Sequence, residues 1–447
     1  MGRKILLEHI ETPDIQSFKV FRSLGGYDAV EKALKTMSPD EVTEEVKKSG
    51  LRGRGGAGFP TGLKWSFIDK KCGKPCYLIC NADESEPGTF KDRYLMEKIP
   101  HRLIEGLICA SYALNANTTY IYIRGEFKYL VGILNNAIKE AYENGFLGKN
   151  ILGTSFNLDI FVHPGAGAYI CGEETALIES LEGKRGNPRI KPPFPASIGL
   201  YDCPTVVNNV ETLANIGYII NNGGDNFAKI GIGRSTGTKL ISACGNINNP
   251  GVYEIEMGVP VEEFIYNENY CGGIKNSKEL KAVVAGGSSV PILPKNLILK
   301  TAAGEPRLLT FESLAEGGFE TGTMLGSGGF IVYDEDACIV RNTWNFTRFY
   351  HHESCGQCSP CREGTGWMEK VLWRIENGEG RTKDIDLLVS IANKIEGTTI
   401  CPLGDAAAWP VASAIRHFRN EFEFHVNSPE IVKNIKHGSL EKYLLKV

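Results

Sequence analysis

The sequence contains no apolar run of the ~18 residues that a membrane-spanning helix needs, and it has no long run of basic residues. Its net charge at pH 7 is only −4 over 447 residues. Without a basic run or a strong positive charge, binding to nucleic acid or to an anionic membrane surface is not expected. We therefore expect a soluble protein that reaches a membrane only indirectly, through partner proteins.

A signal peptide is also missing, although the chain has 13 cysteines. An odd number of cysteines without such a peptide is typical of a reducing compartment, where thiols serve as ligands or core residues. We therefore expect a cytoplasmic protein. No spacing of residues indicates a Ser-His-Asp or Cys-His catalytic set. The length and the ordinary globular composition, 42% hydrophobic and 23% charged, indicate roughly three domains.

Four cysteines form the most specific motif of the chain. Cys355, Cys358 and Cys361 follow one another at intervals of three, and Cys401, followed by a proline, comes from further along the sequence. This spacing is typical of four thiolates that hold a cubic iron–sulfur cluster. A structural zinc site is the alternative, but such sites usually pair two separate C-x-x-C units. The motif therefore predicts electron transfer.

A glycine-rich loop at residues 51–60 contains the pattern G-x-G-x-x-G. The usual dinucleotide fingerprint follows a strand, whereas this loop follows a helix that a capping signal predicts over residues 38–48. The standard interpretation therefore fails, and a cofactor loop and a simple glycine-rich turn both stay open. Two cations, Arg54 in the loop and Lys64 beyond it, favour an anionic or flat aromatic ligand lying against bare backbone.

Strand and helix signals alternate after this loop. Such alternation predicts a parallel sheet covered by helices, and ligands bind beyond the carboxyl ends of such strands. Two acidic loops, residues 81–89 and 163–175, follow the first and third strands at that edge. Their carboxylates can be solvated or helix-start charges, or they can accept hydrogen bonds from ribose or ribityl hydroxyls. The predicted strands are 76–80, 119–123 and 156–163, and the predicted helices are 92–114, 127–142 and 173–181.

The next segment, residues 183–195, is too rich in Pro and Gly for regular structure. It can be a rigid linker, or its cations can approach a pyrophosphate while Phe194 offers a stacking face. A helix is then predicted from Thr205 through Ile219, and the free amides at its start could receive a phosphate.

The predicted secondary structure changes twice in the second half of the chain. Short strands at 239–244, 252–256 and 281–285 predict a small mixed α/β module with a structural or docking role. From Asp336 onward, amphipathic patterns predict a helical bundle whose loops carry the cluster cysteines. We expect the tryptophans of this part in the bundle core. They are Trp344, Trp367, Trp373 and Trp409.

Four long motifs resemble the signatures of the NADH-binding flavoprotein subunit of respiratory complex I. They are RGRGGAGFPTGLKW at 52–65, NADESEPGT at 81–89, GAGAYICGEET at 165–175 and ESCGQCSPCREGT at 353–365. The resemblance runs from about residue 20 to about residue 430. It implies an N-terminal helical arm (1–50), a Rossmann-like parallel-sheet domain for FMN and NADH (51–236), a small β-grasp domain (237–335), and a helical bundle that carries a [4Fe-4S] cluster (336–447).

The family's roles, carried over motif by motif, imply the residues of each site. For FMN they are Gly53, Arg54, Gly55, Gly56, Lys64, Asn81, Asp83, Ser85, Tyr169, Gly172, Glu173, Asn208, Asn209 and Thr212. For NADH they are Phe59, Phe67, Glu86, Glu174, Lys191 and Phe194, with Glu174 at the adenosine ribose. The cluster ligands are Cys355, Cys358, Cys361 and Cys401.

The resemblance also implies the reaction and the partners. NADH is oxidised by hydride transfer to FMN, and electrons pass singly through the cluster towards quinone, without a catalytic acid or base from the protein. The implied partners are a small two-iron thioredoxin-like subunit and a large iron–sulfur subunit, in a hetero-oligomer on the inner face of the cell membrane.

Two alternatives remain beside this interpretation. A soluble NAD-linked hydrogenase or formate dehydrogenase has a related diaphorase subunit, often with extra cysteine-rich domains. The absence of any cysteine after Cys401 favours complex I. The other alternative is a zinc-stapled interaction protein without catalysis.

Overall fold

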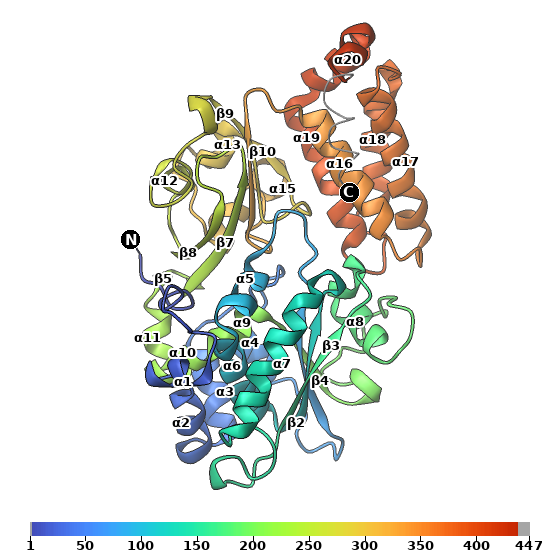
Figure 1. Cartoon of the computed structure of the whole chain (residues 1–447). Helices are drawn as coiled ribbons and strands as arrows, with labels where there is room; N and C mark the ends of the chain where they lie inside the picture. Colours follow the sequence, from blue (N-terminus) through green and yellow to red (C-terminus); the bar gives the residue numbers. More distant parts are fainter. Residues whose placement is uncertain (1, 437–447) are drawn as a thin grey trace.

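Four parallel strands form the sheet in the first half of the chain, as the computed structural model shows (Figure 1). The structure describes residues 2–436. The strands lie in the order β3-β2-β1-β4 and every neighbouring pair is parallel, which confirms the predicted parallel sheet. The strands are β1 Cys76–Ala82, β2 Ala116–Ile123, β3 Asp159–Pro164 and β4 Thr205–Asn209.

The two faces of this sheet border two different hydrophobic cores. Side chains alternate across a strand, so Leu78 and Cys80 of β1 lie in the core under the N-terminal helices, whereas Ile79 between them lies in a core shared with the bundle. The helices around the sheet are α5 Lys91–Lys98, α6 Pro100–Leu114, α7 Lys128–Glu143, α8 Glu174–Leu181, α9 Val210–Ala214, α10 Ile216–Asn222 and α11 Gly224–Ala228.

Two sequence-based expectations for this part were wrong. Thr205 starts strand β4, which pairs with β1, and the helix begins only at Val210. The β-branched Thr-Val-Val run favours a strand. The helix expected over residues 92–114 is two helices, because Pro100 has no amide hydrogen and disfavours a helical conformation of the residue before it.

The glycine-rich loop follows a helix, as predicted. In α3, Pro39–Lys48, the Ser38 hydroxyl accepts a bond from the Glu41 amide at 3.3 Å, and the Glu41 carboxylate accepts one from the Ser38 amide at 2.7 Å. This capping box confirms the expected start of the helix. The neighbouring helices are α1 Phe18–Ser23, α2 Asp28–Thr36 and α4 Thr61–Trp65.

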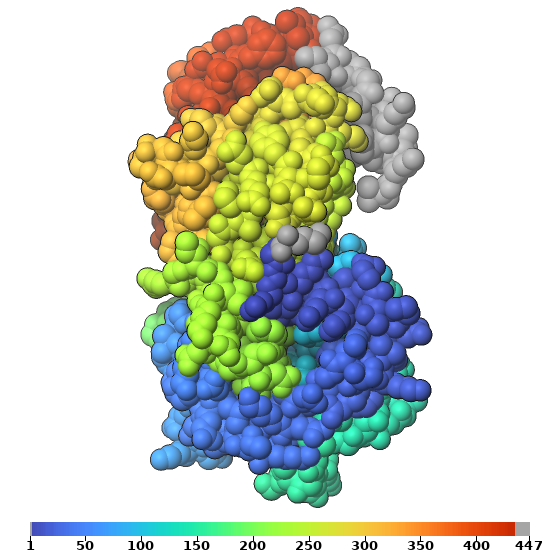
Figure 2. Space-filling view, turned by 90° about the vertical axis from the view of Figure 1, so that its left-hand side faces the viewer, coloured from blue at the N-terminus to red at the C-terminus, as the bar shows by residue number. Residues whose placement is uncertain are grey.

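The chain's first residues are bound to the middle module. The carboxylate of Glu254 accepts hydrogen bonds from the amides of Ile5, Leu6 and Leu7 at 2.8 to 3.0 Å. In Figure 2 this dark blue segment lies between the α/β part below and the yellow middle module above. The arm therefore joins two parts of the molecule.

The middle module is built on a second, mixed sheet. Its order is β10-β9-β11-β7-β8, with β7 and β11 parallel and the other pairs antiparallel. The predicted strands are confirmed as β7 Thr238–Gly245, β8 Gly251–Glu256 and β9 Leu280–Ala285. The remaining elements of the module are β10 Ile292–Pro294, β11 Gly329–Asp334, α12 Val261–Tyr266, α13 Lys295–Leu299, α14 Phe311–Ala315 and α15 Gly318–Thr321. Just before the module, β5 Gly231–Ile232 and β6 Ser235–Thr236 form a separate two-stranded sheet.

The C-terminal part is the predicted helical bundle (Figure 1). Its helices are α16 Ile339–Glu353, α17 Ser359–Glu376, α18 Thr382–Ile395, α19 Leu403–Asn427 and α20 Pro429–Lys436. The expected end of this domain, residues 437–447, lies outside the described residues. Among residues 2–436, no helix has the length and apolar character needed to cross a membrane.

The expectation that all four bundle tryptophans are core residues was wrong. Trp367 and Trp373 are 55% and 44% exposed, while Trp344 and Trp409 are half-buried. The buried positions of α17 include Met368, Val371, Leu372 and Ile375. Trp373 falls outside this stripe, because two positions from 371 turn a helix by about 200°.

Candidate functional site

A cavity of about 390 Å³ lies where the α/β part, the middle module and the bundle meet. Its wall contains the glycine-rich loop, the end of β1 and the loop after β3. Loops of the middle module and the start of α19 complete it. Of the cofactor residues expected from the sequence, the cavity is lined by Gly55, Gly56, Asn81, Asp83, Ser85, Glu86, Tyr169, Gly172, Glu173 and Asn209. Cys401 of the cysteine motif lines it as well.

The glycines let the loop pack tightly against its neighbours. A Cβ on Gly55 would lie 3.0 Å from the Asn209 Cβ, and one on Gly58 would lie 2.7 Å from the Phe311 ring. Gly58 also has φ +64°, a left-handed conformation that favours glycine. The Gly53 amide donates to the Phe59 carbonyl at 2.8 Å. The loop therefore presents bare backbone to the cavity.

Arg54 belongs to this loop, but its side chain does not line the cavity. Its guanidinium donates to the Thr236 carbonyl at 2.7 Å, and its amide donates to the Thr212 hydroxyl at 2.8 Å. The side chain is fully buried, and burial lowers the pKa of Arg54 to about 10, against the opposing effect of Glu211. Thr212 is buried in the same place, so both residues lie behind the loop.

The end of β1 places a buried carboxylate at the cavity. Ser85 donates to Asp83 Oδ1 at 2.7 Å, and Asn81 donates to the Gly172 carbonyl at 2.8 Å. Burial raises the pKa of Asp83 to about 7. Its Oδ2 atom is buried and has no hydrogen-bond partner among the described residues. A hydrogen-bond donor such as a ligand hydroxyl or a water molecule satisfies an oxygen of this kind.

Glu86 connects the three parts that surround the cavity. It accepts hydrogen bonds from Tyr169 Oη at 2.6 Å and from the Ser289 amide at 2.7 Å. Next to it, the Ser288 hydroxyl lies 2.7 Å from the Tyr350 hydroxyl of the bundle. The loop after β3, the middle module and α16 therefore meet at one carboxylate.

A buried group of charges was missed by the sequence analysis, and three of its members, Glu84, Lys91 and Asp92, line the cavity. Lys91 contacts Asp92 at 2.7 Å and Glu211 at 2.8 Å, and Lys239 of the middle module contacts Glu211 at 2.7 Å. Burial lowers the pKa of Lys239 to about 7, although Glu211 opposes this effect. Glu84, beside them, accepts bonds from the amides that start α5. Only Glu84 belongs to one of the four long motifs, and local sequence carries no signal for the other contacts.

A second charged group lies at the start of α8. Lys64 contacts Glu174 at 2.7 Å, and Lys191 contacts Glu174 at 3.0 Å and Glu173 at 2.8 Å. Burial opposes the charge of Glu174, but the two lysines outweigh it and hold the pKa of Glu174 below its ordinary value. Glu173 also caps α8 by accepting bonds from the amides of residues 175 and 176.

The expected stacking aromatics lie at the surface. Phe59 and Phe67 are exposed, and their ring centroids are 6.1 Å apart. Phe194 is also exposed, and among the described residues it makes no ring contact with this pair. Asn208, the remaining expected FMN residue, is buried and accepts a hydrogen bond from the Trp65 indole at 2.8 Å.

The four motif cysteines gather at one end of the bundle. Cys355 and Cys358 lie between α16 and α17, Cys361 lies in the first turn of α17, and Cys401 precedes α19. All four pack against the same core. The structure thus brings together the three closely spaced cysteines and the distant fourth one, a ligand set that is typical of an iron–sulfur cluster.

The residues present therefore fit both cofactors. Bare backbone at Gly55 and Gly56, together with the unsatisfied Asp83 oxygen, fits a flat group that carries hydroxyls. The four thiols fit an iron–sulfur cluster, and Cys401 borders both places. The fold and site define an electron-transfer protein that combines a flavin with an iron–sulfur cluster.

Comparisons with known proteins identify the family within this class. The family model described as the Nuo51 FMN-binding domain matches residues 46–218, and the model for the NADH-ubiquinone oxidoreductase-F iron-sulfur binding region matches residues 341–425. The F 2 subunit of the NADH-quinone oxidoreductase of Rhizobium meliloti (strain 1021) is 50% identical over 95% of this chain and 98% of its own length. The F subunit of the Rickettsia bellii (strain OSU 85-389) enzyme is 51% identical over 93% and 96%.

A solved structure is similar as well. In the crystal structure of an NAD+-reducing [NiFe]-hydrogenase in the H2-reduced state, one chain matches with a TM-score of 0.81 and 34% identity, covering 95% of this chain and 67% of that chain. This chain belongs to the family of F subunits of NADH-quinone oxidoreductases. The resemblance inferred from the four motifs is therefore confirmed. The hydrogenase alternative fits less well, since this chain covers 67% of the matching hydrogenase chain but 98% and 96% of the two F subunits.

Proposed function

We propose that this chain is the electron-input subunit of a multi-subunit NADH-quinone oxidoreductase, which oxidises NADH with FMN and passes electrons through a [4Fe-4S] cluster towards quinone. The observation that carries this function is a cavity lined at once by the glycine loop, by the strand-end carboxylates and by Cys401. The chain is thus an NADH dehydrogenase.

The FMN site is assigned to the cavity. The backbone of residues 53–56 lies against the flavin, and Asn81, Asp83 and Ser85 meet its polar atoms. Asn209 and the loop after β3 complete the wall, while Arg54, Thr212 and Asn208 hold the wall in place from behind. When bound, FMN accepts a hydride from NADH and the cluster carries single electrons onward. The chain's contribution is to position these groups at the junction of its three parts.

The NADH site is assigned to the rim next to this cavity. Phe59, Phe67 and Phe194 offer exposed faces for stacking the nicotinamide and adenine rings. Lys191, Glu174 and Glu86 supply polar contacts for the rest of the dinucleotide. The exposure of these three aromatic side chains supports this assignment, because a stacked ring would remove their faces from water.

The cluster is assigned to the four motif cysteines, with Cys401 nearest the flavin. Because Cys401 lines the cavity and packs on the core shared with Cys361, one residue borders both cofactor sites. This arrangement gives electrons a short path from the flavin into the bundle.

We assign domain boundaries and partners on the same basis. The division is an arm (1–50), a flavin and NADH domain (51–236), a β-grasp domain (237–335) and a cluster bundle (336–447), which agrees with the extents of the two sheets and the bundle helices. The relatives' names describe subunits of a larger complex. We propose a two-iron thioredoxin-like subunit and a large iron–sulfur subunit as neighbours of this chain, peripheral on the inner face of the cell membrane.

The test is NADH oxidation by the FMN-replete chain alone, with ferricyanide as acceptor. Since both nucleotide sites are assigned to one chain, the isolated protein should reduce ferricyanide with NADH. The chain without FMN is the control and should be inactive. If the FMN-replete chain became active only after a second subunit was added, the single-chain site would be wrong.

A further inference from the structure

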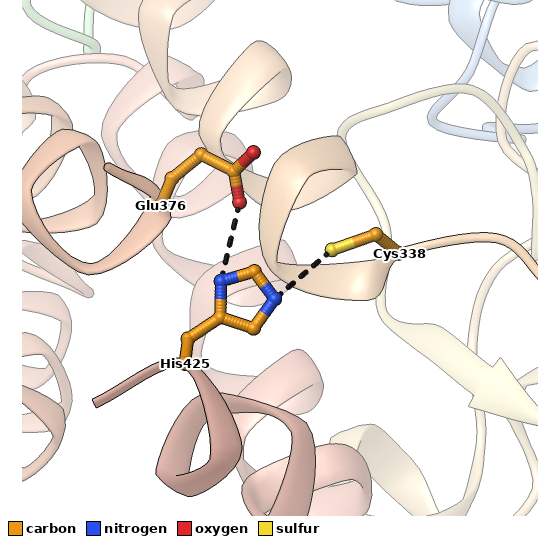
Figure 3. Close-up of side chains that lie close together, drawn as sticks. All are labelled: Cys338, Glu376 and His425. Atoms are coloured by element: carbon orange, nitrogen blue, oxygen red, sulfur yellow. Dashed lines mark hydrogen bonds and ion pairs between the residues drawn. The ribbon is translucent and has the colours of Figure 1, made fainter. Parts of the chain in front are cut away.

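Three side chains with metal-binding atoms converge at one end of the bundle, outside the site described above (Figure 3). Cys338 caps the start of α16, Glu376 is the last residue of α17, and His425 lies in the last turn of α19. The Cys338 sulfur lies 3.4 Å from His425 Nε2, and His425 Nδ1 lies 3.5 Å from Glu376 Oε2. One ligand atom from each lies within 4.8 Å of the others.

This group is separate from the cluster cysteines. Cys338 precedes α16, whereas Cys355 and Cys358 follow it, and a helix of 15 residues is roughly 22 Å long. Glu376 ends α17, which Cys361 begins, and His425 ends α19, which follows Cys401. The same three helices thus carry one set of ligands at one end and another set at the other end.

The donor set selects the kind of metal. A thiol, an imidazole and a carboxylate together match zinc, whereas calcium and magnesium prefer oxygen ligands alone. Zinc bonds of about 2.3 Å to sulfur and about 2.0 Å to nitrogen, at a tetrahedral angle, place the two donors roughly 3.5 Å apart. The 3.4 Å between Cys338 Sγ and His425 Nε2 agrees with this distance.

The three side chains are largely shielded from water, and a further carboxylate lies next to them. Glu376 is 3% exposed and the His425 side chain is 12% exposed, so both are shielded from water. One Glu376 oxygen lies 3.6 Å from the Arg341 guanidinium, and the other lies 3.5 Å from His425 Nδ1. Glu421, one turn before His425, accepts a bond from the Ile339 amide next to Cys338 at 3.0 Å. The other oxygen of Glu421 contacts Lys281 at 3.1 Å. Two carboxylates therefore lie around the thiol, and each of them also contacts a basic side chain.

We propose that Cys338, His425 and Glu376 bind one zinc ion, which joins the ends of α16, α17 and α19. Binding replaces the thiol proton, which leaves to solvent. Because Nε2 of His425 faces the Cys338 sulfur while Nδ1 faces Glu376, an ion bound to Nε2 requires the Glu376 side chain to turn away from Nδ1 before its oxygen coordinates. A water molecule completes the four ligands. The ion stabilises the bundle at the end opposite the cluster, and it takes no part in electron transfer.

The test is zinc and iron analysis of the FMN-replete protein after zinc loading and dialysis against a weak chelator. The variants are Cys338→Ser and His425→Gln, and the matched control is Cys271→Ser, which removes a buried thiol of the middle module. We expect one zinc per FMN in wild type and control, and less than a tenth of that in both variants, with unchanged iron. Zinc should raise the melting temperature of wild type but not of the variants.

Zinc X-ray absorption of the wild-type protein gives a second measurement that needs no variant. One sulfur and three nitrogen or oxygen neighbours are expected. Four sulfur neighbours, or zinc that disappears in Cys401→Ser, would place the ion at the cluster motif and overturn the proposal. Zinc content equal in wild type and the two variants, or no retained zinc in wild type, would overturn it as well.

Discussion

Replacing Glu174 with Gln should shift the preference of the protein from NADH towards NADPH. Glu174 lies between Lys64 and Lys191, and Lys191 also contacts Glu173. Two carboxylates and two ammonium groups therefore balance in charge. The substitution leaves this group with one net positive charge beside the place that we propose for the adenosine ribose. A 2′-phosphate there would then meet attraction in place of a neutral or repulsive environment.

The structure sets the size of this effect. Two unit charges 4 Å apart interact by about 4 kcal/mol at the effective dielectric constant of a protein surface. Lys64, Glu174 and Lys191 have side chains 27%, 24% and 30% exposed, so solvent screening reduces this to about 1.4 to 3 kcal/mol. Since 1.4 kcal/mol is a factor of ten, the ratio of kcat/KM for NADPH to that for NADH should rise at least about tenfold.

The assay measures both specificity constants with ferricyanide as acceptor, at two ionic strengths. Higher salt should reduce the gain, because the effect is electrostatic. Glu179→Gln removes the same charge from α8, where Glu179 contacts Arg189, and serves as the control with an unchanged ratio. Glu173→Ala should mainly reduce FMN retention, since Glu173 lines the cavity and caps α8. An unchanged ratio in Glu174→Gln, or an equal rise in the control, would remove Glu174 from the ribose site.

Two further predictions concern the cluster and the core. Cys401→Ser should abolish the low-temperature paramagnetic signal of the cluster while FMN stays bound, because most of the cavity wall comes from other residues; a retained signal would exclude Cys401 as a ligand. Burial raises the pKa of Glu105 to about 7, so the folded protein holds this proton more tightly than the unfolded chain, and its contribution to stability falls as pH rises from about 4.5 to 7. Glu105→Gln should therefore gain stability relative to wild type across that window in urea unfolding, and a pH-independent difference would contradict the assignment.

Local patterns predicted the helices and strands of this fold well, because the formation of each helix or strand depends on residues that are close in the sequence. The capping signal at Ser38 and the parallel sheet were both predicted from spacing alone. The cysteine spacing indicated a cluster without any tertiary information. The error at Thr205 had a local cause too, since its β-branched run directly precedes a helix and was assigned to the start of that helix.

The position of side chains relative to the cavity could not be predicted in this way. Arg54 sits in a cofactor motif, yet its guanidinium bonds to Thr236, far along the chain, and is buried behind the loop. Lys91 and Lys239 form a buried network through Glu211, and three distant segments must fold together before it exists. Motif matching names the residues near a cofactor, but tertiary contacts decide which of them touch it.

The cavity itself is a property of three parts of the chain rather than of one motif. Glu86 accepts bonds from Tyr169 and Ser289, and Ser288 beside it contacts Tyr350 of the bundle. Because Cys401 borders the same cavity from the bundle side, a displacement of the bundle changes the surroundings of both cofactor sites together. The contacts at Glu86 therefore fix the proposed flavin site relative to the proposed cluster site, as a chain that passes electrons from one cofactor to the other requires.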